Sequence, residues 1–98
     1  MKIGEINMTG KYRAYILLRL SSVGKEWDVV ERTKEIFERE LVTYAVPVYG
    51  AWDIMVEVSY DQLNQLDTIV TKLREDEILG GSIEETTTMV GARATFPW

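Results

Sequence analysis

The side chains that most often carry out enzyme chemistry are missing from this sequence. Its 98 residues contain no histidine and no cysteine. Neither a Ser–His nor a Cys–His nucleophile can therefore be built, and a zinc site would have to consist of carboxylates alone, which is unusual. No glycine-rich phosphate-binding loop of the Walker or dinucleotide type occurs either. The sequence predicts a protein with no catalytic residues, no metal site and no cofactor.

Carboxylates are the remaining groups that could do chemistry. The acidic run 75–77 and the pair Glu84 and Glu85 are the two clusters. Neighbouring residues in a strand point to opposite faces, so Glu84 and Glu85 cannot act together, and we expect both clusters to be solvated surface. Asp53 differs because it stands in an otherwise apolar segment. Such an acid either caps a turn or serves a ligand.

Hydroxyls and aromatic rings could also contact a ligand. Three threonines stand together at 86–88. Threonine is a common strand residue, and its hydroxyl could equally line a polar cleft at the end of a sheet. Trp52, Tyr44 and Tyr49 are of types found more often in a core or an interface than stacked on a ligand. Local chemistry alone leaves these alternatives open.

The overall composition is that of one globular domain, with 46% hydrophobic and 28% charged residues. Lys and Arg number 11 against 16 Asp and Glu, a net charge of −5. Binding a duplex needs a dense basic patch, so we expect no direct nucleic-acid partner. A cysteine-free chain fits the reducing cytoplasm. The longest apolar run, residues 14–18, is far below the ~18 residues of a membrane-spanning helix, so we expect a cytoplasmic protein with no membrane partner.

The elements that must position these groups follow from hydrophobic periodicity. Strands are predicted at 12–21, 41–49, 52–58 and 82–91, and helices at 25–40 and from 59–62 to about 75. This βαββαβ order is typical of an α+β, ferredoxin-like fold, the plan of the dimeric α/β barrels. It has an antiparallel four-stranded sheet with two helices on one face.

Local signals refine these elements. A tight turn at Gly50–Ala51 joins the middle strands into a hairpin, and Pro47 marks a sheet edge, a bulge or a strand end. Ser59 and Gln62 have the spacing of a capping box for the second helix. The buried stripe of the first helix should contain Trp27, Val29, Val30, Ile36, Phe37 and Leu41, and that of the second Leu63, Leu66, Ile69, Val70 and Leu73.

The first strand is apolar on both faces. Ala14, Ile16, Leu18 and Leu20 alternate with Tyr15, Leu17 and Arg19. Two helices can cover only one face of the sheet, and a contiguous apolar face is too large to leave in water. The pattern therefore predicts a face-to-face homodimer.

The segment VYGAWDIMVEV, residues 48–58, resembles the signature of the effector domain of the Lrp/AsnC (feast/famine) family. That signature runs apolar, variable, Gly, variable, aromatic, Asp, then an apolar strand. The resemblance covers residues 12–90, including a first strand like AYILLRL, a Gly-Lys-Glu entry into the first helix and a threonine-rich last strand.

The resemblance implies a RAM domain whose dimers pack sheet to sheet and assemble further, often into rings of four dimers (an octamer). Free amino acids bind such domains at the junction between dimers, near the hairpin and the last strand. Gly50, Trp52 and Asp53 match the motif, and Ala51 stands where members often carry a polar residue. The implied ligand-binding residues are Gly50, Ala51, Trp52, Asp53, Thr87 and Thr88.

Full-length members carry a helix-turn-helix before this domain, and residues 1–11 are too few for one. The expected organisation is a lead-in at 1–11, a RAM-like ligand-binding and oligomerisation domain at 12–91 and a tail at 92–98. Such a stand-alone domain would sense an amino acid and modulate full-length regulators through mixed assembly. Two alternatives stay open: a small dimeric α/β-barrel enzyme of the monooxygenase type, and a ligand-free oligomerisation scaffold.

Overall fold

The computed structural model describes residues 12–91, and the predicted lead-in and tail lie outside them. The elements follow the predicted order. They are β1 (Tyr12–Leu20), α2 (Glu26–Ile36), β2 (Val42–Pro47), β3 (Ile54–Tyr60), α3 (Asn64–Glu75) and β4 (Ile83–Val90).

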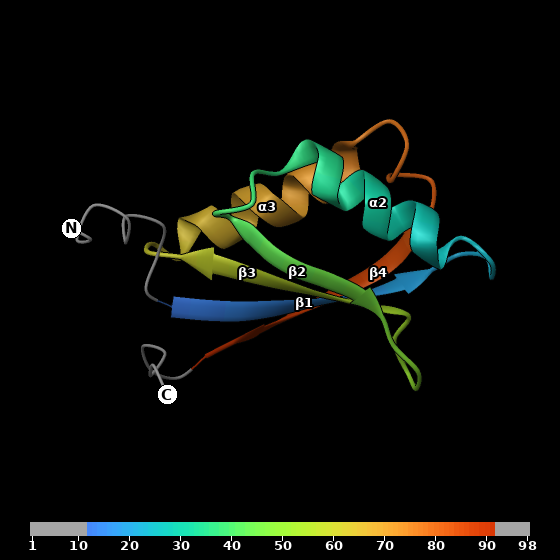
Figure 1. Cartoon of the computed structure of the whole chain (residues 1–98), viewed down its shortest axis with the longest axis horizontal. Coiled ribbons are helices and arrows are strands. Elements are labelled where there is room, and N and C mark those ends of the chain that lie inside the picture. The colour runs from blue at the N-terminus through green and yellow to red at the C-terminus, as the bar shows by residue number, and fades with distance from the viewer. Residues whose placement is uncertain (1–11, 92–98) are drawn as a thin grey trace.

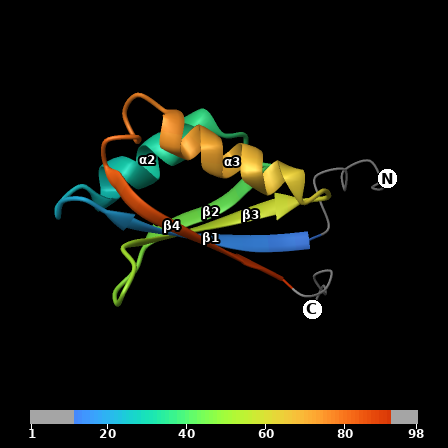
Figure 2. The ribbon, with the colours of Figure 1, turned by 180° about the vertical axis from the view of Figure 1, so that it is seen from behind.

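The four strands form one antiparallel sheet in the order β2-β3-β1-β4. Both helices cover the same face of this sheet (Figures 1 and 2). The predicted ferredoxin-like α+β fold is therefore confirmed. Pro47 ends β2, which is an edge strand, as expected for a residue with no N–H to donate.

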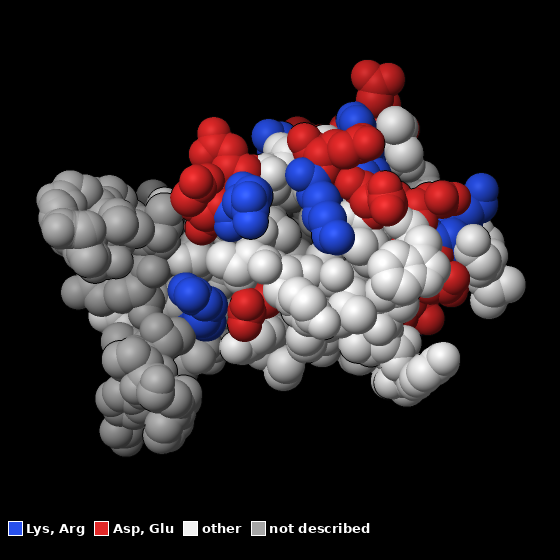
Figure 3. Space-filling model, viewed as in Figure 1, with Lys and Arg blue, Asp and Glu red and all other residues white. Residues whose placement is uncertain are grey.

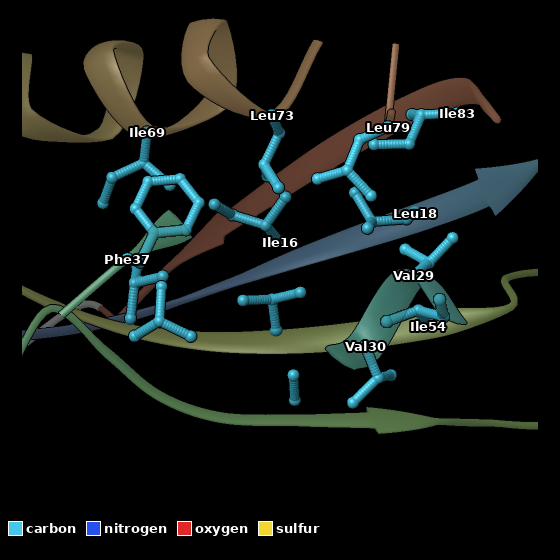
Figure 4. Close-up of a cluster of buried hydrophobic side chains, with 14 of the residues drawn as sticks. Ile16, Leu18, Val29, Val30, Phe37, Ile54, Ile69, Leu73, Leu79 and Ile83 are labelled. Atoms are coloured by element: carbon cyan, nitrogen blue, oxygen red, sulfur yellow. The ribbon is translucent and has the colours of Figure 1, made fainter. Parts of the chain in front are cut away.

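The core lies between the sheet and the helices (Figure 4). Alternate residues of β1 are buried there, with Ile16 and Leu18 at 0% exposure. Ile69 and Leu73 of α3 and Val30 of α2 meet them from the helical side. Burying side chains of this size contributes about 1.5–3 kcal/mol each, so this layer supplies most of the stability.

Two of the predicted core positions are wrong. Trp27 is 64% exposed and Leu63 is 66% exposed. Each lies at a helix start, Trp27 in the first turn of α2 and Leu63 at the N-cap of α3. Burial begins later in both helices, at Val29 in α2 and at Leu66 in α3. The first helix is also shorter than predicted, since Phe37 is extended and Leu41 is only half-buried beyond its end.

The predicted capping box is wrong as well. Ser59 belongs to β3 and is 3% exposed. Its backbone N–H donates to the carbonyl of Leu41 at 2.9 Å, and its hydroxyl accepts from Arg13 Nη1 at 3.0 Å. Pairing in the sheet thus competes successfully with capping the helix.

The side chain of Gln65 holds the segment just before α3. The amide oxygen of Gln65 accepts from the backbone N–H groups of Asp61 and Gln62, at 2.6 and 2.8 Å. These N–H groups belong to residues just before the N-cap, Leu63, so Gln65 fixes the approach to α3 and does not cap the helix. The entry into α3 therefore lies several residues later than Ser59.

Asp76 departs from the prediction of a solvated acidic run. Its side chain is 9% exposed and accepts hydrogen bonds from Arg32 Nε and Nη2, at 3.0 and 2.8 Å. The same carboxylate accepts from the backbone of Ile78 and Leu79. Asp76 therefore ties the end of α3 to α2. The Arg32 hydrogen bonds lower the pKa of Asp76 from 3.8 to about 2.

This pKa predicts a pH dependence of folding. The folded state keeps Asp76 charged below the ordinary aspartate pKa, so its stabilising contribution is complete above pH about 4 and is lost as the pH falls through about 2. Thermal unfolding followed by circular dichroism should give Asp76→Asn a lower Tm than wild type at pH 6. The difference should narrow toward pH 2. Glu77→Gln, a change at an exposed neighbour, should leave the curve unchanged, and equal pH profiles for wild type and Asp76→Asn would contradict the assignment.

Candidate functional site

The segment of the family motif forms a loop between β2 and β3. The predicted two-residue turn is too short, because the strands end at Pro47 and resume at Ile54. The backbone N–H of Val48 donates to the carbonyl of Asp53 at 2.9 Å and closes a turn at residues 49–52. Both views show the loop projecting away from the helices (Figures 1 and 2). Below, "the loop" means residues 48–53.

Asp53 attaches this loop to the centre of the sheet. Its backbone N–H donates to the carbonyl of Leu18 at 2.9 Å. Its carboxylate Oδ2 accepts from the backbone N–H of Leu20 at 2.8 Å. The register of the β1–β4 pairing shifts next to this contact, between Arg19 and Leu20. The carboxylate thus accepts a hydrogen bond from a backbone N–H at the end of β1. This is a turn-capping role, one of the two roles that the sequence left open for Asp53.

Arg19 contacts the loop from the adjacent position of β1. Its Nε and Nη2 donate to the carbonyl of Ala51 at 3.2 and 3.1 Å, and Nη1 pairs with the carboxylate of Glu85. The guanidinium carbon lies 4.4 Å from the ring centroid of Trp52, within the range of a cation–π contact. Sequence reasoning missed Arg19 as a site residue. The available signal was a cation near the end of the first strand, on its apolar second face.

Gly50 stands at the tip of the loop in a conformation that suits glycine. Its φ is +121°, and a Cβ added there would meet nothing within 4 Å. The requirement for glycine is therefore conformational and not steric. Gly50 and Ala51 are both exposed, but the Ala51 carbonyl is already hydrogen-bonded to Arg19.

The two threonines of the predicted site lie on opposite faces. Thr87 pairs with Leu17, on the face that the helices leave bare, whereas Thr88 pairs with the buried Ile16 on the helical face. Thr88 lines a hollow with α3 residues such as Leu66. The register therefore places Thr87 on the same face as Arg19, two residues along β4 from Glu85, the partner of Arg19. Thr88 lies on the opposite face, away from Arg19 and Thr87.

A groove runs between the loop and the start of α2, with a volume of about 510 Å³. Its lining residues are Glu26, Trp27, Val46, Pro47, Val48, Tyr49, Gly50 and Asp53. Exposed aromatic rings, Trp27 at 64% and Tyr49 at 105%, stand on its two sides. The groove thus offers apolar walls and two carboxylates next to the backbone of Gly50.

Charged side chains gather elsewhere. Figure 3 shows most acidic and basic side chains over the helical layer, with a largely uncharged surface below it. A hollow of about 670 Å³ lies there, lined by residues of α2 and α3 that include the Arg32–Asp76 pair. None of the predicted site residues lines it. The Arg32–Asp76 pair in it joins α2 to the end of α3.

Residues 12–91 offer neither a metal centre nor a membrane-spanning helix. No group of three or more carboxylate, histidine or cysteine side chains in that part of the chain could hold a metal ion. No helix there combines the length and apolar character needed to cross a membrane.

Two solved structures share enough sequence with the chain to define its family. FFRP-DM1 is 32% identical, with a TM-score of 0.63, over 82% of this chain and 97% of that protein. A hypothetical protein from Pyrococcus horikoshii is also 32% identical, with a TM-score of 0.64, over 84% of this chain and 90% of that one. No family model and no curated protein matches the sequence. The fold and this identity place the chain in the Lrp/AsnC (feast/famine) family.

More distant regulators share the fold. E. coli AsnC has a TM-score of 0.73 at 15% identity, and the match covers all of this chain and 62% of AsnC. A transcriptional regulator from Neisseria meningitidis, solved as an L-Met complex, has a TM-score of 0.60 at 10% identity over 95% of this chain and 56% of its own. The described residues therefore share their fold with part of these transcriptional regulators.

The conformation of Gly50 predicts a specific cost of substitution. Gly50→Ala should lower the free energy of unfolding by about 1–3 kcal/mol, the usual cost of holding a side chain in such a backbone conformation. Gly81→Ala is the matched control, since an added Cβ there also meets nothing within 4 Å and its φ is not positive. Urea denaturation of both variants measures the difference, and equal stabilities would show that Gly50 does not need its positive φ.

Proposed function

We propose that the protein is an amino-acid-binding effector module of the Lrp/AsnC family that works as an oligomer and catalyses no reaction. The observation that carries this proposal is the 32% identity to FFRP-DM1 over almost all of that protein. The L-Met complex of a regulator with the same fold supports an amino acid as the ligand class. Action on full-length regulators by mixed assembly, in the cytoplasm, is part of the proposal.

The loop has the chemistry that a free amino acid needs. The zwitterion requires an anion or carbonyls near its ammonium and N–H or hydroxyl donors near its carboxylate. Gly50 lets a ligand approach the backbone closely, Asp53 supplies a carboxylate, and Thr87 is the threonine on the Arg19 face. The groove beside the loop, about 510 Å³, lies within the usual range of small-molecule sites. We propose Gly50, Ala51, Trp52 and Asp53 as the binding segment, in which Gly50 and Asp53 line the groove and Ala51 and Trp52 lie between them in the loop.

The bare face of the sheet suits a second copy of the chain. Register places Val46, Met55 and Leu17 side by side across three strands, and Met89 lies beside Tyr15 one row away. None of them is fully buried in one chain, and Met89 is 50% exposed. Removing this apolar surface from water favours association. We propose a sheet-to-sheet dimer that assembles further, with an octamer as the expected ring.

The alternatives differ from this proposal in specific ways. A monooxygenase-type barrel needs a cavity between sheet and helices, but that space holds buried side chains such as Ile16, Ile69 and Leu73. A ligand-free scaffold shares the sheet-to-sheet surface and differs only in binding nothing. With a net charge of −5, direct binding of duplex DNA is also not part of the proposal.

Isothermal titration against the twenty amino acids should find at least one ligand. Asp53→Ala should weaken it by about tenfold or more, since a lost charge-assisted hydrogen bond costs about 1.5–3 kcal/mol. Gly50→Val should also weaken it by about tenfold or more, because a β-branched side chain does not suit the positive φ of Gly50 and would hold the ligand off the backbone. Thr71→Ala, a change at an exposed position of α3, is the control and should bind as wild type does. Circular dichroism checks that the sheet and helices persist. Absence of any binder from the assembled protein would leave the scaffold as the better description.

Sedimentation at micromolar concentration should give a dimer or a larger assembly. Leu17→Glu puts a charge at the centre of the bare face and should shift the protein toward the 11.3 kDa chain mass. Val23→Glu places the same charge at a position that is 90% exposed outside the sheet and should not. A monomer for wild type, or a Leu17→Glu variant that assembles normally, would refute the sheet-to-sheet dimer.

A further inference from the structure

Three consecutive residues at the end of β1 hold three consecutive residues of the loop. Leu18 and Leu20 hold Asp53 through their backbone groups, and Arg19 between them holds Ala51 and Trp52. Asp53 fixes where the loop rejoins the sheet. Arg19 extends this attachment toward the tip, where Gly50 precedes Ala51.

The contacts of Arg19 use the whole guanidinium group. Nε and Nη2 share the carbonyl of Ala51, Nη1 meets Glu85, and the plane lies against Trp52. A guanidinium presents its donors in a fixed planar fork and stacks on aromatic rings. Lysine has a point charge on a flexible stem and cannot make these contacts together. The arrangement therefore selects arginine by geometry and not by charge alone.

The contacts of Arg19 should affect the loop more than they affect the stability of the whole domain. The side chains of Arg19 and Glu85 are 38% and 55% exposed, and ion pairs with that exposure contribute little to global stability. The shape of the loop should depend more strongly on Arg19, because Ala51 is exposed and Trp52 only half-buried, so burial alone does not fix their positions. Loss of Arg19 should thus change the position of the loop far more than it changes the Tm.

We propose that Arg19 is a positioning residue for the ligand site: it holds Ala51 and Trp52 so that the loop keeps its binding-competent shape, and Glu85 orients the guanidinium. The proposal rests on the amino-acid site proposed above, but its structural half can be tested without any ligand. Arg19 acts through Ala51 and Trp52 and makes no ligand contact itself.

The ligand-independent test is the fluorescence of Trp52. A Trp27→Phe, Trp98→Phe background leaves Trp52 as the one tryptophan of the three in the sequence. In that background, Arg19→Lys and Arg19→Gln should shift the Trp52 emission to longer wavelength and increase its quenching by acrylamide. The Tm should fall by no more than about 5 °C, the size expected for an exposed ion pair in a domain of this length. Glu85→Gln should give a smaller shift in the same direction, and Glu84→Gln none.

The ligand test repeats the twenty-amino-acid titration on the same Arg19 and Glu84 substitutions made in the otherwise wild-type chain, because Trp27 lines the groove. Arg19→Lys and Arg19→Gln should weaken the ligand of the wild-type protein by about tenfold or more, with Glu84→Gln unchanged. Unaltered Trp52 emission in both Arg19 variants overturns the proposal. So does altered emission with unaltered affinity, which would leave the proposed function intact. If wild type binds none of the twenty, the proposed function and the binding half of this proposal fail together, while a Trp52 shift still supports the role of Arg19 in holding the loop.

Discussion

The alternation of side chains along β1 is the constraint on which the rest of the structure depends. β1 is paired on both sides, with β3 and β4, so its backbone cannot shift without breaking two ladders. Even-numbered residues such as Ile16 and Leu18 must then face the helices, and odd-numbered residues such as Leu17 and Arg19 must face away. A slip of one residue would exchange these faces and place the Arg19 guanidinium in the core. The core and the proposed ligand loop therefore share one register.

The bare face combines an apolar centre with carboxylates that already have hydrogen-bonding partners. Tyr15 lies opposite Glu57 and is hydrogen-bonded to its carboxylate, and the partial burial of the phenol, together with Glu57, raises the pKa of Tyr15. Arg19 and Glu85 form the second pair. A carboxylate that already has a partner is less costly to bring against another sheet than a free one. Together with the apolar row through Leu17, these pairs make the face compatible with association.

Sequence patterns predicted the order of elements because two-residue and 3.6-residue periodicities are local properties. They failed where a residue's role depends on distant partners. Ser59 has the spacing of a helix cap, but its backbone pairs with Leu41 across the sheet. Trp27 has the spacing of the apolar stripe but lies in the first turn of α2, outside the core. The family motif indicated the loop, whereas the contacts of Arg19 depend on strand order and loop length, which no local pattern contains.

The loop lies between two surfaces with different functions in the proposal. One side of it lines the groove with α2, and the other meets Arg19 on the bare face of the sheet. A ligand in the groove that moves the loop would also move Trp52 and the Arg19 guanidinium that lies against it and, through Arg19, Glu85 of β4. Because interfaces tend to exchange between discrete arrangements and do not deform continuously, a small movement there would change how well two bare faces fit. The geometry of Arg19 thus gives a physical route by which binding of an amino acid and assembly of the protein would influence each other, and by linkage that influence would be equal in both directions.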